Sequence, residues 1–501
     1  MILLHKRLPI FYNALLLTGV NLLLRLVSTS FQVYLSGRIG AEGIGLLQLV
    51  MSVGSMAMTA GMAGIRTATM YLTAEALGRK QHKTIGWVLS ACIRYSLVCS
   101  CALSALLYYA APWIAESWIG NTQIIGAVRL FAAFLPVVCL CGVMSGYFTA
   151  ANRIRSLAAV EIAEQFFSMG ITILALSFWA GNSPARACQS VVIGSSAGAC
   201  LTLICLVVLR LKEQSYGCEK VPVTRKLLDT AVPLAFADDL KAGISTTENM
   251  MVPKRLSLYA GSGSPLAEFG TVCGMVFPVM MFPAAILFGL NELLIPELAR
   301  CNASGSRSRI QYLVQRSLRV AMLYGIFFCG MLVLLADELC MALYGNSDAG
   351  RYLKQFSLMV PMLYCDAVTD AMTKGLGQQK LCVRYNILTS ALDVIFLYLL
   401  LPKFGMQGYF LSFLATHLLN FILSLRRLLI ITGRQMQWKI PLASIVIMFA
   451  AIWGASHITA PVLRAITYPV LLGSSLFLLG IVKKEDLNWL LSLLQQKERS
   501  H

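Results

Sequence analysis

Charged residues are scarce in this sequence. Only 13% of the 501 residues are Asp, Glu, Lys or Arg, whereas soluble domains carry about 25%. Acidic residues are scarcer than basic ones, with 23 Asp and Glu against 41 Lys and Arg, and the formal net charge is +18. Hydrophobic residues make up 57% of the chain, and the mean hydropathy is +0.72. This composition excludes an ordinary soluble domain and predicts an all-α polytopic membrane protein.

Several kinds of chemistry have no motif here. The sequence contains no G-x-x-x-x-G-K-[ST] phosphate loop and no H-E-x-x-H zinc motif. No predicted loop exceeds about 20 residues, which leaves no room for a soluble catalytic domain. The 15 cysteines form no C-x-x-C pair and lie mostly in apolar runs, which favours core packing over metal or redox roles. We therefore expect no enzymatic activity, no cofactor and no metal.

Long apolar segments fill most of the chain. A membrane-spanning helix needs about 20 apolar residues, and fourteen such helices fit in this sequence with short loops. The predicted spans are residues 9–35, 43–75, 85–112, 124–151, 157–180, 187–210, 227–252, 266–297, 317–341, 353–375, 381–402, 405–431, 440–460 and 465–482.

Basic residues are unevenly distributed between the two sides of this topology. With a cytoplasmic N-terminus, 28 Lys and Arg fall on the cytoplasmic side, 8 on the opposite side and 5 inside spans. This bias predicts that both termini are cytoplasmic. Because the bases lie between apolar runs, membrane topology explains them, and we expect no nucleic-acid partner.

Two short segments look like copies of each other. They are GYFTAANRIRSL, from Gly146, and GLGQQKLCV, from Gly375, and pairing Arg153 with Lys380 gives an offset of 227 residues. The repeat predicts an N-terminal lobe, a basic cytoplasmic linker, a C-terminal lobe and two additional helices with a cytoplasmic tail. These correspond to residues 1–211, 212–226, 227–431 and 432–501. Such repeats place a substrate site between the two halves.

Polar residues form stripes on three predicted helices, at steps of three and four residues that keep them on one helix face. The stripes are Thr18, Asn21, Arg25, Ser28 and Gln32; Gln48, Ser52, Ser55, Thr59, Arg66, Thr69 and Thr73; and Asp238, Lys241, Ser245 and Glu248. An arginine in mid-span costs about 2.5–3.5 kcal/mol even on the lenient insertion scale. The stripes therefore predict a wet central cavity.

The bases in these stripes suit an anionic substrate, since a guanidinium presents a planar fork of donors to phosphate. The predicted substrate-binding residues are Asn21, Arg25, Ser28, Gln48, Ser52, Thr59, Arg66, Lys241 and Ser245. Three stripe bases face two stripe carboxylates, a surplus that favours an anion. The alternative is that each charge has a buried partner and only fixes helix packing.

Carboxylates inside spans are candidates for binding a coupling cation, Na⁺ or H⁺. The candidates are Asp238, Glu248, Asp366, Asp370 and Asp393. For Glu161 and Glu164 we expect salt bridges with the nearby Arg153 and Arg155.

Five segments then occur in an order typical of one family. They are LSGRIGAEGIGLLQL, GYFTAANRIRSLAAVEIAEQ, MVPKRL, GLGQQKLCVRYNIL and LLPKFGMQGYF, between Leu35 and Phe410. The chain resembles the stage V sporulation protein B and polysaccharide-transport branch of the multidrug/oligosaccharidyl-lipid/polysaccharide exporter superfamily. It departs from that branch at SGYFTAANRIRS, which lacks the usual basic residue before the glycine and the glycine-rich turn after the aromatic. It also departs at Glu248, where an aspartate is usual.

The resemblance implies two helical lobes in alternating access, with the first, second, seventh and eighth helices lining the cavity. It implies a flippase for undecaprenyl-pyrophosphate-linked oligosaccharides or peptidoglycan precursors, acting as a multi-pass protein of the bacterial cytoplasmic membrane. Arg25 falls where related lipid II flippases carry a cavity arginine. We expect a monomer whose partners are the lipid-linked glycan and the bilayer. The alternatives are a multidrug or cation antiporter of the same superfamily, typically with twelve helices, and a membrane-embedded glycosyl- or acyltransferase.

Overall fold

The computed structural model describes residues 8–62, 64–79, 82–181, 183–212, 224–433 and 439–481. Within these ranges the chain is helical and contains no strand, so the expected all-α class is confirmed. Helical segments lie within all fourteen predicted spans, although the second, eighth and tenth spans are each divided between two or more helices. Nine helices in the described ranges are long and apolar enough to cross a membrane, or ten if a pair bent by 62°, Pro265–Met281 with Ala284–Ala303, is one span. Fourteen crossings therefore remain a prediction.

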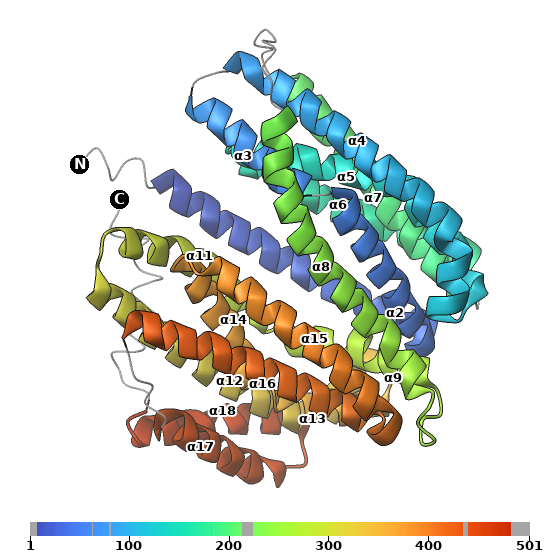
Figure 1. The fold of residues 1–501 in the computed structure, drawn as a ribbon. Helices are drawn as coiled ribbons and strands as arrows, with labels where there is room; N and C mark the ends of the chain where they lie inside the picture. Colours follow the sequence, from blue (N-terminus) through green and yellow to red (C-terminus); the bar gives the residue numbers. More distant parts are fainter. Residues whose placement is uncertain are drawn as a thin grey trace. The chain divides into compact units, whose positions relative to one another are not determined.

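The chain divides into two compact units (Figure 1). Unit 1 comprises residues 1–278 and 387–416, and unit 2 comprises residues 279–386 and 417–501. The predicted lobes have other boundaries, 1–211 and 227–431, and most of the linker between them lies outside the described residues. The lobes remain a prediction.

Helices of unit 1 come mainly from the first half of the chain. They are α2 (Leu8–Met62), α3 (Ile65–Gly78), α4 (His82–Trp113), η1 (Ile114–Ile119), η2 (Thr122–Ile124), α5 (Ile125–Ala150), α6 (Ile154–Ala175), η3 (Leu176–Ala180), α7 (Pro184–Leu211), α8 (Thr224–Leu256), α9 (Pro265–Thr271) and η4 (Val272–Val276).

The remaining helices belong to unit 2 or pass from one unit to the other. They are α10 (Phe277–Met281), α11 (Ala284–Ala303), α12 (Arg307–Tyr344), α13 (Ser347–Ser357), α14 (Val360–Gly375), α15 (Gln379–Phe404), α16 (Met406–Thr432), α17 (Lys439–Ser456) and α18 (Pro461–Leu478).

Two glycines change the helices predicted near the N-terminus. Helix α2 runs through the first two predicted spans and is kinked at Gly40, whose φ of 69° and ψ of 178° are not helical. The second predicted span is interrupted before α3, where Gly64 adopts a φ of 70°. A Cβ at Gly64 would lie 2.4 Å from the carbonyl oxygen of Ala231 on α8. Glycine is needed there both for its backbone conformation and for the close approach of α8.

The predicted internal repeat has a structural counterpart in two helix ends. After α5, Asn152 has a positive φ of 57°, and the Arg153 amide donates to the Phe148 carbonyl over 2.9 Å. After α14, Gly377 has a φ of 80°, and the Gln378 amide donates to the Thr373 carbonyl over 3.1 Å. Both are left-handed C-terminal caps with a bond across six residues. They correspond at an offset of 225 residues, two fewer than the sequence comparison predicted.

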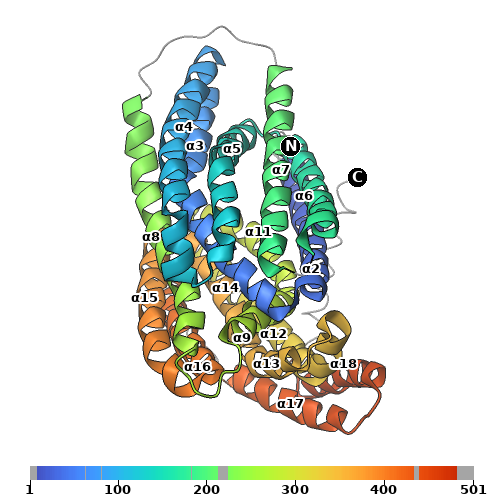
Figure 2. The same cartoon turned by 90° about the vertical axis from the view of Figure 1, so that its right-hand side faces the viewer.

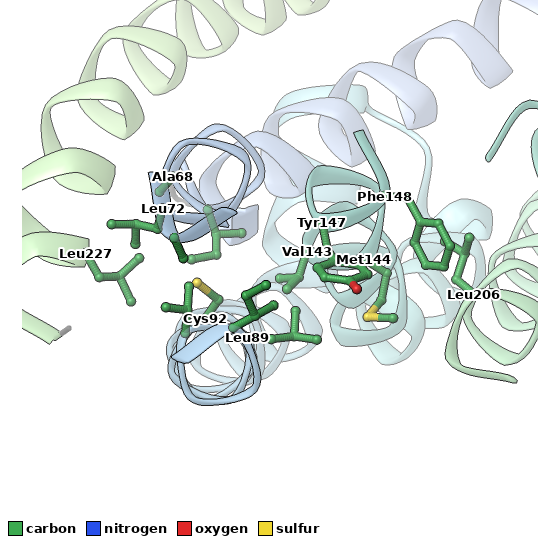
Figure 3. Close-up of a cluster of buried hydrophobic side chains, with 14 of the residues drawn as sticks. Ala68, Leu72, Leu89, Cys92, Val143, Met144, Tyr147, Phe148, Leu206 and Leu227 are labelled. Atoms are coloured by element: carbon green, nitrogen blue, oxygen red, sulfur yellow. The ribbon is translucent and has the colours of Figure 1, made fainter. Parts of the chain in front are cut away.

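Apolar side chains from six helices, α3 to α8, form a core cluster in unit 1 (Figure 3). Leu72 of α3, Leu89 of α4, Val143 of α5, Leu206 of α7 and Leu227 of α8 are all buried in it. This cluster fixes α3 and the start of α8, two helices that carry predicted site residues, against α4, α5 and α7.

Helices α6 and α7 meet along small residues. The segment Gly194–Gly198 reads G-S-S-A-G and so matches the G-x-S-x-G pattern of hydrolase nucleophiles. It lies inside α7 rather than between a strand and a helix. A Cβ at Gly194 would lie 1.9 Å from the Thr172 hydroxyl of α6. These glycines therefore serve close helix packing.

Helices α17 and α18 pack against each other and against α12 in unit 2 (Figure 2). Arg464 of α18 forms a 3.0 Å ion pair with Glu338 of α12 and donates to the Leu334 carbonyl over 3.0 Å. One turn later the buried Tyr468 donates to the Ile326 carbonyl over 3.1 Å. The C-terminal helix pair is thus an integral part of this unit.

Candidate functional site

Helix α2 carries the first polar stripe on a partly accessible face. The Arg25 side chain is half-buried and that of Ser28 is exposed. Ser28 accepts a hydrogen bond of 3.3 Å from Gln165 of α6. Gln32, one turn further on, donates to the Gly274 carbonyl of η4 over 3.2 Å. Asn21 lies on the same helix. The stripe is thus packed against η4 at Gln32 and accessible at Ser28.

The later part of α2 faces α8 rather than open space. Ser52 accepts a bond of 2.9 Å from the Asn249 amide, and its carbonyl accepts one of 3.1 Å from Thr246. Gln48 and Thr59 are half-buried, and the Thr59 hydroxyl donates to the Ser55 carbonyl within its own helix. Ser52 therefore helps to join two helices, in line with the packing alternative for this residue.

The α8 stripe is more exposed than that of α2. Asp238, Lys241 and Ser245 are all exposed, while Glu248 is half-buried. Lys254 and Arg255, the bases of the MVPKRL segment, anchor the end of this helix. Lys254 donates to the Ser117 carbonyl over 3.3 Å, and Arg255 donates to the Tyr398 carbonyl over 3.1 Å. These two bases hold helices together.

Arg66 of α3 has an internal counter-charge that the sequence pattern did not indicate. Its side chain is exposed, and it interacts electrostatically with the half-buried carboxylate of Glu161 on α6. Glu164 instead accepts a hydrogen bond of 2.6 Å from Thr202 of α7. Glu161 and Glu164 thus have contacts across helices. Their expected salt bridges with Arg153 and Arg155 stay a prediction.

The charge balance of the candidate site changes accordingly. Arg25, Arg66 and Lys241 were expected to outnumber Asp238 and Glu248. Glu161 adds a third carboxylate beside one of the bases, so the stripes and their neighbour carry no net surplus. Recognition of an anion at this site would therefore depend on the local arrangement of individual guanidinium groups.

Two of the coupling-ion candidates lie near each other in unit 1. Asp393 of α15 is only 8% exposed and accepts hydrogen bonds from the hydroxyls of Ser412 and Thr416 on α16, at 2.5 and 3.2 Å. Glu248 of α8 lies within electrostatic range of this carboxylate. The two hydroxyls thus contact one carboxylate, and a second carboxylate lies within electrostatic range. Oxygen groups of this kind suit a hard cation or a proton.

Two further candidates lie in a cavity of about 150 Å³ in unit 2. Asp366 accepts hydrogen bonds from the Asn420 amide over 3.1 and 3.3 Å. Asp370, one turn along α14, forms a 2.5 Å ion pair with Lys374, which already balances its charge. Asn386 completes the polar lining. Asp366 is thus held by a neutral amide, while Lys374 lies within electrostatic range of it and pairs with Asp370.

Sequence reasoning missed the neutral partners of these charges. The contacts above are made by uncharged residues that belong to none of the predicted stripes, namely Gln165, Asn249, Ser412 and Thr416. The spacing of Ser412 and Thr416, four residues apart, was the available signal, since it puts both hydroxyls on one face of α16. No group of three His, Cys, Asp or Glu side chains that could hold a metal ion occurs in the described part of the chain.

Comparison with known proteins identifies relatives of this architecture. Residues 18–160 match the model of the MatE family. The stage V sporulation protein B of Bacillus subtilis (strain 168) is 21% identical over 410 residues, which cover 79% of each chain. The expected resemblance is confirmed.

Solved structures show the same fold at low sequence identity. The lipid II flippase MurJ, in an inward closed conformation, matches with a TM-score of 0.69 and 14% identity, covering 94% of this chain and all of that one. An inward-facing multidrug resistance MATE family transporter of the MOP superfamily matches with a TM-score of 0.65 and 14% identity, over 84% of this chain and all of that one. The fold is therefore that of this transporter superfamily, in a multi-pass membrane protein.

Proposed function

We propose that this protein moves an undecaprenyl-pyrophosphate-linked oligosaccharide or peptidoglycan precursor across the bacterial cytoplasmic membrane by alternating access. The observation that carries the proposal is the accessible face of α2, where Arg25 and Ser28 lie in the middle of a membrane-spanning segment. Arginines within membrane-spanning segments are rare and often mark the path of a substrate. A pyrophosphate offers paired oxygens that match its fork of donors.

Transport against a gradient requires an energy source, and the chain has no nucleotide-binding loop. The Glu248–Asp393 pair and the Asp366 cavity are the groups that support coupling to Na⁺ or H⁺. Binding of a cation to either set would neutralise charge within a span, which changes the free-energy difference between two conformations that expose it differently. We infer that these carboxylates, rather than a cofactor, couple transport to an ion gradient.

A multidrug antiporter is the second candidate, and one observation favours it. The MATE transporters share the fold, and the carboxylates of the site offset its bases, which removes the positive surplus that would repel a lipophilic cation. The length of the chain argues against it. Helices α17 and α18 are docked on α12 by Arg464 and Tyr468, and on the predicted count of fourteen spans they are the pair beyond the twelve typical of antiporters.

The two candidates differ in the ligand that the purified protein binds. The flippase proposal predicts saturable binding of undecaprenyl-pyrophosphate-linked glycan in detergent or nanodiscs, with competition by soluble pyrophosphate analogues. It predicts no competition by the cationic dye ethidium. Tight ethidium binding together with no response to the lipid would replace this proposal by the antiporter.

A further inference from the structure

Helix α6 presents a polar face that the proposed function does not use. Glu161, Gln165 and Ser168 follow one another at steps of four and three residues, so they share one side of the helix. Gln165 contacts α2 directly, through its 3.3 Å hydrogen bond to Ser28. Ser28 lies three residues after Arg25 on the same face of α2. The α6 face therefore adjoins the part of α2 that carries the proposed phosphate-binding arginine.

Glu161 and Gln165, the first two residues of this face, have unused hydrogen-bonding capacity. In the described part of the chain, Gln165 makes a single hydrogen bond, to Ser28. A carboxamide has two donor hydrogens and two acceptor lone pairs, so most of its capacity stays open. Glu161 is half-buried and accepts no hydrogen bond from the described residues, although Arg66 lies within electrostatic range. A half-buried carboxylate without donors is costly in a membrane-spanning segment.

Sugar hydroxyls supply the missing partners. Each hydroxyl donates one hydrogen bond and accepts others. A carboxylate can accept from it, and a carboxamide can do both. In a lipid-linked glycan the first sugar is bonded directly to the pyrophosphate, so its binding site must adjoin the phosphate site. A face of Glu161 and Gln165 beside Arg25 and Ser28 meets that requirement.

We propose that Glu161 and Gln165 of α6 form a subsite for the first sugar of the lipid-linked glycan. The inference rests on the proposed function, because it assumes that the pyrophosphate binds near Arg25. On this proposal, the guanidinium groups of α2 and α3 bind the phosphates, and the carboxylate and carboxamide groups of α6 bind the sugar. It also explains why carboxylates and bases occur together at this site.

The test compares two probes on the purified full-length protein in nanodiscs. One probe is lipid II, which carries a glycan, and the other is undecaprenyl pyrophosphate, which carries none. The measured quantity is the ratio of their dissociation constants, which does not depend on the fraction of active protein. Gln165→Ala should weaken lipid II binding about five- to tenfold, the effect of losing one hydrogen bond of about 1–1.4 kcal/mol. It should leave undecaprenyl pyrophosphate binding within twofold.

Glu161→Ala should shift the ratio in the same direction, because it removes an acceptor for sugar hydroxyls and at the same time frees Arg66 for phosphate. Gln407→Ala is the matched control, since Gln407 is an exposed glutamine on α16 in the same unit, and its ratio should equal that of the wild type. Equal effects of Gln165→Ala on both probes, or no effect on either, would overturn the subsite while leaving the flippase proposal intact. Failure of the wild type to bind either probe would overturn the proposed function itself.

Discussion

Asn420 donates hydrogen bonds to both carboxylate oxygens of Asp366, over 3.1 and 3.3 Å. Asp366 thus keeps a fixed orientation at the wall of the unit 2 cavity, with Lys374 within electrostatic range. Its neighbour Asp370 differs, because Lys374 pairs with it over 2.5 Å. The structure therefore separates two carboxylates that the sequence pattern treats as equivalent.

Asp366→Asn should uncouple transport from the ion gradient. The substitution keeps the size of the side chain and removes its charge, so a cation or proton loses its partner there. We expect at least a tenfold loss of ion-stimulated transport in proteoliposomes, with lipid binding unchanged. Asp348→Asn, in an exposed pair with Arg351, is the control and should behave like the wild type. Full ion stimulation in Asp366→Asn would exclude this carboxylate from coupling.

Arg66 and Glu161 should be energetically coupled. Arg66→Ala leaves the Glu161 carboxylate without its electrostatic partner, so we expect a lower melting temperature and weaker binding of undecaprenyl pyrophosphate. The double variant Arg66→Ala with Glu161→Gln should recover most of the melting temperature but not the binding, because only the charge imbalance has been repaired. Additive effects of the two substitutions on melting would mean that the side chains act independently.

Ser412 should stabilise the protein through Asp393. The hydroxyl is fully buried and donates over 2.5 Å to the carboxylate. Ser412→Ala removes this donor, and a hydrogen bond to a charged group contributes about 1.5–3 kcal/mol. We expect a clear decrease in thermal unfolding temperature in detergent. Ser30→Ala, which removes an exposed hydroxyl bonded within its own helix, should leave the temperature nearly unchanged, and an equal decrease in both variants would argue against a special role for Asp393.

Gly270 should tolerate no side chain, in contrast to another glycine of unit 1. A Cβ at Gly270 of α9 would lie 2.1 Å from the Ala41 carbonyl oxygen of α2, whereas a Cβ at Gly37 meets nothing within 4 Å. Gly270→Ala should therefore sharply reduce the yield of folded protein in size-exclusion chromatography. Gly37→Ala should be neutral or stabilising by up to about 1 kcal/mol, because alanine favours a helix. Normal folding of Gly270→Ala would show that α2 and α9 are less closely packed than described.

The length of the apolar runs predicted where helices lie, because an apolar run of sufficient length has few alternatives to a helix in a membrane. The kink at Gly40 and the break at Gly64 were not predictable, since each depends on what approaches the chain there. The polar stripes correctly indicated unusual helix faces. They could not distinguish Ser52, which is bound to Asn249 of α8, from the exposed Lys241, because the partner lies about 200 residues away in the sequence.

The partners of charged residues were unpredictable for a similar reason, because they lie on other helices. Arg66 looked unpaired because its counter-charge, Glu161, lies on another helix, and nearby Arg153 and Arg155 offered a simpler local partner. Conversely, Asp393 stood out as a mid-span carboxylate, yet its hydroxyl donors on α16 carry no charge and give no signal in a charge count. Pairings across helices are decided by packing, which a single sequence does not display.

The most direct test of the proposed function is a binding measurement on wild type, Arg25→Ala and Arg25→Lys in nanodiscs, with lipid II as ligand and ethidium as competitor. The account predicts saturable binding to the wild type that is insensitive to ethidium, at least tenfold weaker binding in Arg25→Ala, and partial recovery in Arg25→Lys, which keeps the charge but loses the planar fork of donors. Equal lipid binding by all three proteins, or displacement of the lipid by ethidium, would contradict it.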